Sequence, residues 1–419
     1  MAISAATVWE IRTTGLTTNG GGFANLSPGV SVDYSQQDAP ILTRADFLKG
    51  VGANDITTSA GAACFTQAMI GNIICMTTTA LHFYQITAVS GDLKTITVDS
   101  TVGLSTAKSG SVGGAYNFGA NDVIFFGAPS KVVGNILYVK VGTYTSVSSS
   151  ITIPGDMIFI GYNAIRNDNP TGANRPVIDF GSASRFSFSS GTAYFHNLIF
   201  TGSYSNLIYG AAPLSVFISN CKFSNTNTST SGYRVIECNG TFVHCEFSSV
   251  KGTCISGDSI FVDCCYFHDG NTGIVVTTWC GIRSCVFKNF TVPATRPQAG
   301  INLVGGGGGS FVHVYGCIFY NCSNGIVNTS SLADNAIIVN NIFDACGTGI
   351  SWYATAAANN TFDYNCYHCS VVDVFNISKG LHDITADPLF MFPLTNDFRL
   401  SAGSPCFNTG MQLGSIVGL

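Results

Sequence analysis

The sequence is poor in charge, and it is especially poor in glutamate. Only 10% of its 419 residues are charged, and the only glutamates are Glu10, Glu237 and Glu246. Because glutamate and lysine are strong helix formers, their scarcity argues against a helical protein. Glycine is plentiful at 47 residues, and Val, Ile, Thr, Ser, Phe and Tyr dominate much of the remainder. That composition favours short strands joined by tight turns.

Long apolar runs and basic clusters are also missing. No stretch of 18 or more apolar residues occurs, so we expect no membrane insertion. The opening MAISAATVWEIR lacks the basic and apolar regions of a secretory signal, so we expect none. Lys and Arg do not gather on one stretch, which argues against nucleic acid as a partner. Yet 46% of the residues are hydrophobic, which excludes disorder, and the length predicts two domains or a repeat.

A repeat runs through the second half of the chain. Its marker is an aromatic residue that ends a short phrase such as FVDCCYF, and successive markers are 20 to 32 residues apart. The apolar spacing inside each phrase is two, never 3.6, so each repeat holds about three short strands. Such a period is typical of a solenoid, whose coils are stable only when stacked on their neighbours. The markers are Phe200, Phe223, Phe247, Phe267, Phe287, Phe319, Phe343 and Tyr367.

Three further positions recur with the marker. Gly-Ile or its equivalent follows it downstream. The position two residues before it holds small side chains that we interpret as buried and stacked: Leu198, Cys221, Cys245, Cys265, Cys285, Cys317, Asn341 and Asn365. The position three residues before it is rich in residues that tolerate a sharp bend: Asn197, Asn220, His244, Cys264, Ser284, Gly316, Asn340 and Tyr364.

The 16 cysteines are expected to be free and mostly buried. A long chain without a secretory signal is a poor setting for a disulfide framework. Only Cys366-x-x-Cys369, with His368 between, approaches the spacing of zinc ligands, and one such pair is more often structural. We therefore expect no metal site and no cofactor.

The hydrophobic-x-x-Asn-x-x-Phe…Gly-Ile rungs between about 190 and 370 resemble those of the right-handed parallel β-helix superfamily, the pectate-lyase-like fold. Residues 135–163 resemble the first coil of such solenoids, and residues 387–410 resemble the segment that covers the last coil. Cysteine replaces most of the asparagine ladder that the family often carries. The resemblance implies an all-β protein in three parts: a β-rich attachment or capping region at 1–130, the solenoid at 131–375 and a C-terminal cap at 376–419.

The N-terminal region resembles that of β-helix proteins encoded by tailed bacteriophages. The resemblance rests on the Gly-rich opening at 8–40 and on a strand pair at 71–103 with a hairpin turn at Ser90-Gly91-Asp92. It implies a virion protein, such as a tail spike, fibre or head decoration, exposed on the particle and joined to other virion proteins through this region. It also implies a homotrimer that can bind host surface polysaccharide. Because the fold also hosts lyases and hydrolases, a polysaccharide depolymerase is the alternative.

A polysaccharide-cleaving β-helix needs carboxylates on neighbouring rungs, or a carboxylate beside a basic residue. Lys222, Glu246 and Tyr266 fall on three successive rungs, which are about 4.8 Å apart. Asp258, Asp263 and Asp269 form a second acidic group near the same rungs. The alternative for Lys222 and Glu246 is an ordinary surface ion pair, and the aspartates are equally well explained as turn or surface residues.

The column that holds Glu246 and Tyr266 continues as an apolar line of Val286, Ile318 and Ile342. Contiguous exposed apolar surface usually marks an interface, so we expect these three side chains at the subunit contact of the trimer. The alternative is a strand or loop of the same chain that covers them. The long step between markers adds a loop at 288–300, and long loops on a solenoid tend to carry binding.

Four aromatic residues are candidates for stacking on sugar rings. Trp279 and the Trp352-Tyr353 pair lie just past the Gly-Ile column, and Tyr266 lies on the rung beside Glu246. For the tryptophans, a place in the core or in an interface is the alternative.

Overall fold

The computed structural model describes residues 7–78, 80–118, 135–145, 151–153, 156–182, 185–188, 191–203, 206–210, 214–225, 233–248, 252–291, 298–305, 311–330, 335–353 and 359–407. They form an all-β protein with stacked coils between 136 and 375, as predicted from the repeat. Among these residues, no helix is long and apolar enough to cross a membrane. Two compact units divide the chain, Met1–Phe200 and Thr201–Leu419. This boundary falls inside the repeat, so the division at 130 and 375 stays a prediction.

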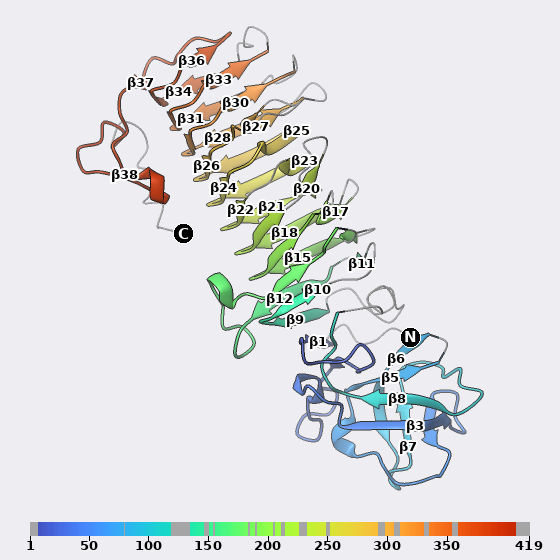
Figure 1. Cartoon of the computed structure of the whole chain (residues 1–419). Coiled ribbons are helices and arrows are strands. Elements are labelled where there is room, and N and C mark those ends of the chain that lie inside the picture. Colours follow the sequence, from blue (N-terminus) through green and yellow to red (C-terminus); the bar gives the residue numbers. More distant parts are fainter. Residues whose placement is uncertain are drawn as a thin grey trace. The chain divides into compact units, whose positions relative to one another are not determined.

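A small antiparallel barrel occupies the first part of the N-terminal unit (Figure 1). Its strands follow the order β3-β4-β7-β6-β5-β8. The predicted hairpin joins β6 to β7, where the N–H of Ser90 donates to the carbonyl oxygen of Thr95 at 2.8 Å. The bounds are β3 (Leu42–Lys49), β4 (Asp55–Thr58), η2 (Gln67–Met69), β5 (Ile73–Thr77), β6 (Leu81–Val89), β7 (Thr95–Val98) and β8 (Lys108–Val112).

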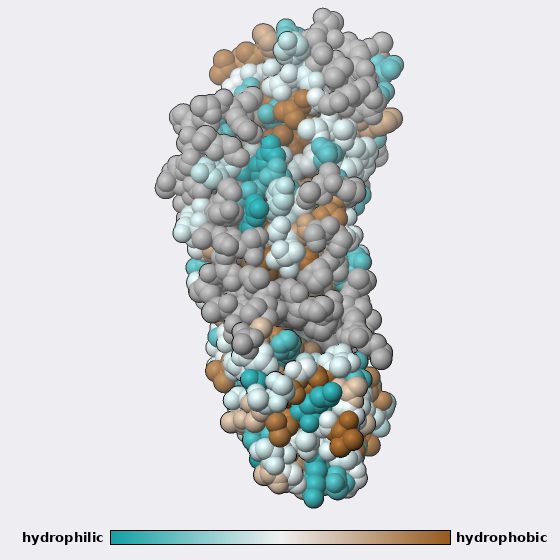
Figure 2. All heavy atoms as spheres, turned by 90° about the vertical axis from the view of Figure 1, so that its right-hand side faces the viewer, coloured by the Kyte–Doolittle hydropathy of each residue, from teal (hydrophilic) through white to brown (hydrophobic). Residues whose placement is uncertain are grey.

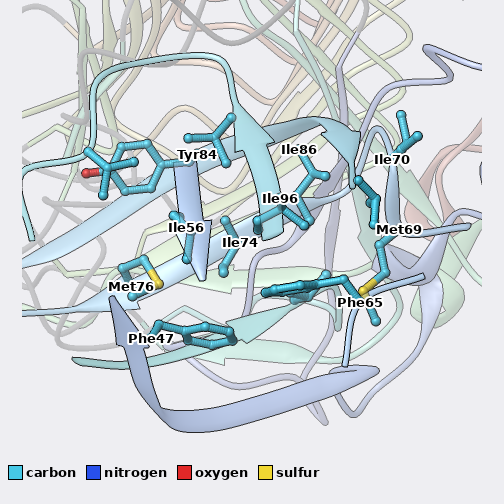
Figure 3. Packing of buried hydrophobic residues seen from close by; sticks show 14 of the residues in the cluster. Phe47, Ile56, Phe65, Met69, Ile70, Ile74, Met76, Tyr84, Ile86 and Ile96 are labelled. Carbon is cyan, nitrogen blue, oxygen red and sulfur yellow. The ribbon is translucent and has the colours of Figure 1, made fainter. Parts of the chain in front are cut away.

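Alternating side chains of these strands point inward and form the core of the barrel. Figure 3 shows Phe47, Ile56, Ile74 and Ile96 directed toward one another from different strands. The rings of Phe47 and Phe65 stack with centroids 6.0 Å apart. The described strands of this barrel close on one another, so none of them is left as a free edge strand.

A short N-terminal strand closes the first coil of the solenoid. β1 pairs in parallel with β9 and antiparallel with β2, and Trp9 and Ile11 are fully buried. This pairing covers the edge that the first coil would otherwise expose. The elements are β1 (Val8–Ile11), β2 (Gly22–Phe23), η1 (Tyr34–Gln36), β9 (Ile136–Lys140), β10 (Thr143–Thr145), β11 (Ile151–Ile153), β12 (Ile158–Tyr162), η3 (Gly172–Asn174), β13 (Val177–Asp179), β14 (Phe186–Phe188), β15 (Thr192–His196) and β16 (Ile199–Gly202).

The same strand places a fully buried carboxylate, Glu10, at this end of the coils. Its Oε1 accepts from Nε of Arg12 at 2.9 Å, and its Oε2 accepts from Nε of Arg166 at 2.8 Å. The hydroxyl of Tyr162 also donates to Oε1, and burial raises the pKa of this phenol. Because the buried charge is paired and hydrogen-bonded, it fixes β1 to the first coil without an unpaired ion.

The coils of the C-terminal unit have three faces, each a parallel sheet. Sheet S1 contains β17 (Ile208–Gly210), β20 (Arg234–Glu237), β27 (Ala299–Leu303), β30 (Asn324–Asn328), β33 (Thr348–Trp352), β36 (Val372–Phe375) and the first halves of β23 (Thr253–Asp263) and β25 (Thr272–Arg283). Sheet S2 contains β18 (Ser215–Ser219), β21 (Asn239–Val243), β28 (Phe311–Tyr315), β31 (Asn335–Val339), β34 (Thr361–Asp363) and the second halves of β23 and β25.

Sheet S3 forms the third face. It contains β19 (Lys222–Asn225), β22 (Glu246–Ser248), β24 (Tyr266–His268), β26 (Val286–Lys288), β29 (Ile318–Tyr320), β32 (Ile342–Asp344), β35 (Cys366–His368) and β37 (Ile384–Thr385). The marker aromatics from Phe223 to Tyr367 lie on these strands and stack along the interior, with neighbouring rings 4.7 to 5.3 Å apart.

The stacked rings explain the recurring Gly-Ile. A Cβ added to Gly325 would lie 2.5 Å from the ring of Phe343 and 2.6 Å from the carbonyl oxygen of Gly349. Only glycine fits so close to the ring and to the next coil. The bend column is confirmed as well, because all eight of its residues have φ between 50° and 64°. These residues turn the chain from S2 into S3.

The cysteine column is a buried stack of free thiols, as predicted. The thiol of Cys265 donates to the carbonyl oxygens of Asp263 (3.3 Å) and Phe242 (3.5 Å), and burial holds its pKa well above the usual range. Asparagine takes over at the C-terminal end, where Oδ1 of Asn341 accepts from the N–H of Cys317 at 2.9 Å. Both residue types therefore hold neighbouring coils together at the same position.

After the last coil, a hairpin folds back over S3. It consists of β38 (Phe390–Phe392), η4 (Pro393–Thr395) and β39 (Asp397–Leu400), and β38 pairs antiparallel with β39 (Figure 1). We call residues 387–407 the strap.

Candidate functional site

The strap covers the apolar line on S3. Val286, Ile318 and Ile342 are 3%, 3% and 2% exposed, and they form one cluster with Phe398 of the strap. This corrects the prediction that these three side chains meet another subunit. The alternative of a covering segment from the same chain is what the structure shows.

Polar contacts fix the strap to the sheet. The ammonium of Lys288 donates to the carbonyl oxygen of Pro393 at 3.0 Å and to Oδ1 of Asn396 at 2.6 Å. The hydroxyl of Tyr266 donates to the same Oδ1 at 2.8 Å, and the side chain is only 6% exposed. Tyr266 therefore helps to hold the strap against S3, and the prediction that it stacks on a sugar is wrong.

The predicted neighbours Lys222 and Glu246 do pair, on the part of S3 where β19 and β22 lie. Their Nζ and Oε1 atoms are 2.7 Å apart, and both side chains are about one-third exposed. His268 adds a second contact, from Nε2 to the same Oε1 at 3.2 Å. The hydrogen bond from His268, together with that from Lys222, lowers the pKa of Glu246 to about 2. A general acid needs a raised pKa, so Glu246 is unsuited to protonate a leaving group.

Two aspartates of the predicted acidic group, Asp263 and Asp269, also have hydrogen-bond partners. Asp269 accepts from Nδ1 of His268 at 2.7 Å and from Nδ2 of Asn289 at 2.8 Å. Asp263 accepts from Nη2 of Arg283 at 2.7 Å. Glu246 and Asp269 thus share one imidazole instead of facing each other across a groove. The arrangement is that of a surface hydrogen-bonded network, and it offers no pair of carboxylates for glycoside hydrolysis.

The tryptophans differ from each other. Trp352 is 3% exposed and packs edge-on against Phe362 at 5.0 Å, so its predicted stacking on sugar is wrong. Tyr353, the next residue, is 65% exposed, and Trp279 is 41% exposed. Of the predicted loop at 288–300, residues 292–297 lie outside the described residues.

Sheet S2 presents an aromatic outer face. Trp279 is the register partner of Phe311, which is 51% exposed, and Phe217 on β18 is 40% exposed. Phe261 lies between these strands, with the guanidinium of Arg283 5.2 Å from its ring centre. Large exposed apolar side chains on neighbouring rungs form the kind of patch that usually marks a binding surface. We call these side chains the S2 aromatic face.

A pocket opens beside the S2 aromatic face, at the corner between S1 and S2. Its volume is about 350 Å³, and it is lined by Tyr209, Arg234, Glu237, Asn239, Asp258 and Thr277 among others. Figure 2 views the side where β17, β20, β23 and β25 are labelled in Figure 1, and hydrophilic side chains gather in the upper half of that view. The size is at the lower end for small-molecule sites.

A bulge in β23 creates this corner. Between Ser256 and Ile260, β23 has one residue more than the preceding coil has between the partners Glu237 and Gly240. The register with β25 shifts again here, because Thr277 and Thr278 of β25 both lie opposite Asp258. Oδ1 of Asn239 accepts from the N–H groups of Asp258 (2.8 Å) and Ser259 (3.0 Å) and holds the bulge in place. Ser259 in turn is the register partner of Trp279, which places the exposed indole next to the pocket.

The polar groups of the pocket are fixed before any ligand arrives. Glu237 pairs with Nη1 of Arg234, and its Oε2 accepts from Nδ2 of Asn206 at 2.7 Å. The hydroxyl of Thr277 donates to Oδ1 of Asp258. A pocket with fixed donors and acceptors beside an exposed indole suits a ligand that has hydroxyl groups and an apolar ring face.

This pocket was not predicted from the sequence, although the sequence contains signals for it. Glu237 is one of only three glutamates, and it stands three residues after Arg234. Asp258 was noted only as part of an acidic group. Nothing in a repeat alignment reveals that β23 and β25 each gain a residue at this corner, because the extra residues are visible only in the register of the strands.

Comparisons with known proteins identify no family for this chain. No protein-family model matches the chain, and no curated protein matches it. Among solved structures, the catalytic unit of a GH87 α-1,3-glucanase from Streptomyces thermodiastaticus is 10% identical with a TM-score of 0.30, covering 85% of this chain and 96% of that one. Tailspike protein gp49 of Pseudomonas phage LKA1 is 12% identical with a TM-score of 0.19, covering 82% of this chain and 60% of that one. Likenesses this distant carry no argument about activity.

Proposed function

We propose that this chain is a glycan-binding β-helix whose ligand lies on the S2 aromatic face and reaches into the adjoining pocket. One observation carries the proposal: the 41% exposed indole of Trp279 stands beside a pocket of about 350 Å³ lined by charged and polar side chains. An indole stacks on the apolar face of a pyranose, while fixed polar groups bind its hydroxyls. Sugar chains combine these two chemistries.

The intrinsic fluorescence of the protein tests this proposal. Of the three tryptophans, Trp9 is fully buried and Trp352 is 3% exposed, so an added ligand can contact only Trp279. Titration with purified bacterial surface polysaccharides should shift the emission and protect it from quenching by acrylamide. The Trp279→Ala variant should lose that response. If no polysaccharide in a broad panel changes the emission or co-elutes with the protein, the proposal fails.

The proposal places the chain on a bacteriophage particle, as a spike, fibre or head decoration. Its support is the resemblance of the N-terminal region to β-helix virion proteins. We further propose that this region joins other virion proteins and that the chain assembles as a homotrimer through a surface other than the apolar line. Sedimentation equilibrium should then give three times the chain mass of 44.0 kDa. A monomer at micromolar concentration would contradict the trimer.

Cleavage of the bound glycan is the second candidate function. Glu237 and Asp258 both line the pocket, and paired carboxylates are what glycoside hydrolysis needs. The size distribution of a polysaccharide after incubation separates the two functions. If the parent protein shortens the polymer and the Glu237→Gln variant leaves it intact, the protein is a depolymerase. If the parent protein leaves the polymer unchanged and co-elutes with it, the protein only binds the glycan.

A further inference from the structure

A cysteine, a histidine and an aspartate line up at the edge of S3, far from the proposed glycan site in sequence. Sγ of Cys369 lies 3.2 Å from Nε2 of His368. Nδ1 of the same imidazole lies 2.8 Å from Oδ1 of Asp344, on the neighbouring strand β32. A nucleophile, a base within hydrogen-bonding reach and a third group that orients the base are the elements of an activated nucleophile.

The aspartate determines which imidazole nitrogen carries the proton. An ionised carboxylate only accepts hydrogen bonds, so Nδ1 of His368 must be the donor to Asp344. In the neutral ring, Nε2 then keeps its lone pair and faces the thiol of Cys369. Asp344 is 8% exposed, so the positioning carboxylate is held firmly by its surroundings.

Exposure distinguishes this thiol from the others. Cys369 is exposed, whereas the remaining fifteen cysteines are buried or intermediate. Cys264 makes a useful contrast. It lies in the bend column between S2 and S3, and its neighbour is an acid instead of a histidine. Its Sγ lies 3.4 Å from Oδ1 of Asp263, and burial together with this carboxylate raises its pKa to about 11. Cys264 is therefore a partly exposed thiol without a base.

The backbone at Cys369 also has free donors. Among the described residues, the N–H groups of Cys369 and Ser370 have no hydrogen-bond acceptor. Cys369 adopts a left-handed φ of 50°, and the corresponding residues of the preceding coils have φ of 52° to 60°. In contrast to them, no described strand of a later coil pairs with Cys369 at this corner. Unpaired N–H groups next to a nucleophile can stabilise negative charge that develops on it or on a bound ligand.

We propose that Cys369 is a nucleophilic thiol that reacts by thiol–disulfide exchange, with His368 as its base and Asp344 as a positioning residue. The co-reactant is a disulfide from outside the chain. Nε2 of His368 takes the thiol proton, and the Cys369 thiolate attacks one sulfur of the external disulfide. A new S–S bond forms to Cys369, the old S–S bond breaks, and its electron pair leaves on the second sulfur, which takes the proton from the imidazolium.

The site thus serves as a point of covalent attachment at the edge of the solenoid. It takes a small disulfide or a disulfide on a partner surface, and it releases one thiol for each bond formed. No external oxidant is required, because the oxidised sulfur comes from the co-reactant.

Reaction of the native full-length protein with 4,4′-dithiodipyridine, a neutral aromatic disulfide, tests the proposal. The released thiopyridone reports the rate, and peptide mapping of the partly reacted protein identifies the modified cysteine. We expect one fast equivalent on Cys369 and slow reaction of Cys264. If Cys406 or Cys264 reacts first in the unaltered protein, the proposal is overturned, and this outcome depends on no variant.

Three substitutions test the roles of the partners. His368→Asn should slow modification of Cys369 by about tenfold or more, since the general base is lost. Asp344→Asn should also slow it, and Asp344→Glu should restore most of the rate, which a merely structural role would not produce. The slow rate of Cys264 serves as the folding control in each variant. An unchanged rate at Cys369 in His368→Asn, with Cys264 still slow, would refute the role of the imidazole.

Discussion

The strap can be released from S3 by one substitution, Phe398→Ala. Phe398 is 6% exposed, and its ring meets Tyr320 and Phe390 edge-on at 5.5 and 5.4 Å. Removing a buried phenylalanine costs about 3–5 kcal/mol. The strap is a short hairpin with few other buried side chains, and hairpins of this size are at best marginally stable alone. We therefore expect the strap to detach while the coils stay folded.

Hydrogen exchange measured by mass spectrometry checks this expectation. Amides of residues 387–407 should exchange faster in Phe398→Ala by a factor of 100 or more, since each 1.4 kcal/mol corresponds to about tenfold. The coils around Phe319 should keep their protection. Phe392→Ala is the matched control, because Phe392 lies in the same hairpin but is 61% exposed. Equal exchange in the two variants would refute the assignment of Phe398 as the anchor of the strap.

The Phe398→Ala variant also tests whether the strap shields the apolar line from solvent. Detachment would expose Val286, Ile318 and Ile342 as a contiguous apolar surface. Such surfaces drive association. Phe398→Ala should therefore form larger species in size-exclusion chromatography and bind a hydrophobic dye, whereas Phe392→Ala should do neither. A dye-negative Phe398→Ala variant with the elution volume of the parent would show that the line is covered in some other way.

Three further outcomes follow from the coils and the pocket. Gly325→Ala should lower the free energy of unfolding by about 1–3 kcal/mol in chemical denaturation, because its Cβ would lie 2.5 Å from the ring of Phe343. Trp279→Ala should weaken glycan binding, measured by titration calorimetry, by up to about tenfold at nearly unchanged stability, since stacking contributes about 0.5–1.5 kcal/mol. Glu246→Gln should lower stability by about 1–2 kcal/mol, mainly between pH 4.5 and 6.5, in denaturation followed as a function of pH.

The signs of the pH effect follow from the two pKa shifts. The pKa of Glu246 falls from 4.5 to about 2, so its contribution is complete above pH 4.5 and disappears as the pH falls toward 2. For His268, burial alone would lower the pKa, but hydrogen bonds to Glu246 and Asp269 outweigh it and raise the pKa above 6.5. Its contribution is complete below pH 6.5 and disappears at higher pH. A pH-independent effect of Glu246→Gln would contradict this pairing.

Matched controls exist for the other two substitutions. Gly103→Ala adds a Cβ with nothing within 4 Å and should leave stability unchanged. Tyr353→Ala removes a 65% exposed aromatic side chain away from the lining of the pocket and should leave glycan affinity unchanged. An equal loss of affinity in Tyr353→Ala would move the binding site to the end of S1.

The coils could be predicted because the same physical constraints act on every repeat. A ring stack requires a glycine beside it, a left-handed bend requires a residue that tolerates it, and both therefore recur at fixed places. The hairpin at Ser90–Asp92 was predicted for the same reason, since its turn chemistry is local. Local rules thus gave the all-β solenoid from a single sequence.

Contacts between distant segments could not be predicted in this way. Val286 and Phe398 are separated by more than 100 residues, and no repeat links them, so the apolar line was mistaken for a subunit contact. Trp352 was mistaken for an exposed platform because its cover, Phe362, comes from the next strand of a different sheet. The pocket depends on the extra residues that β23 and β25 each carry near Asp258, which shift the strands without changing the repeat. These features depend on which side chains from other strands or segments pack against each residue, and a single sequence does not show those contacts.

The three faces of the C-terminal coils differ in what they leave for a ligand. The strap covers much of S3, and outward positions of S1 such as Ser256, Asn302 and Val327 are at most 8% exposed. Within the described part of these sheets, S2 is the face that exposes large aromatic side chains from neighbouring rungs. A glycan that binds along the coils should therefore protect Trp279 and Phe311 in hydroxyl-radical footprinting and leave the rate at Phe392 on the strap unchanged. Protection of the strap instead would place the ligand on S3 and remove the argument for the S2 aromatic face.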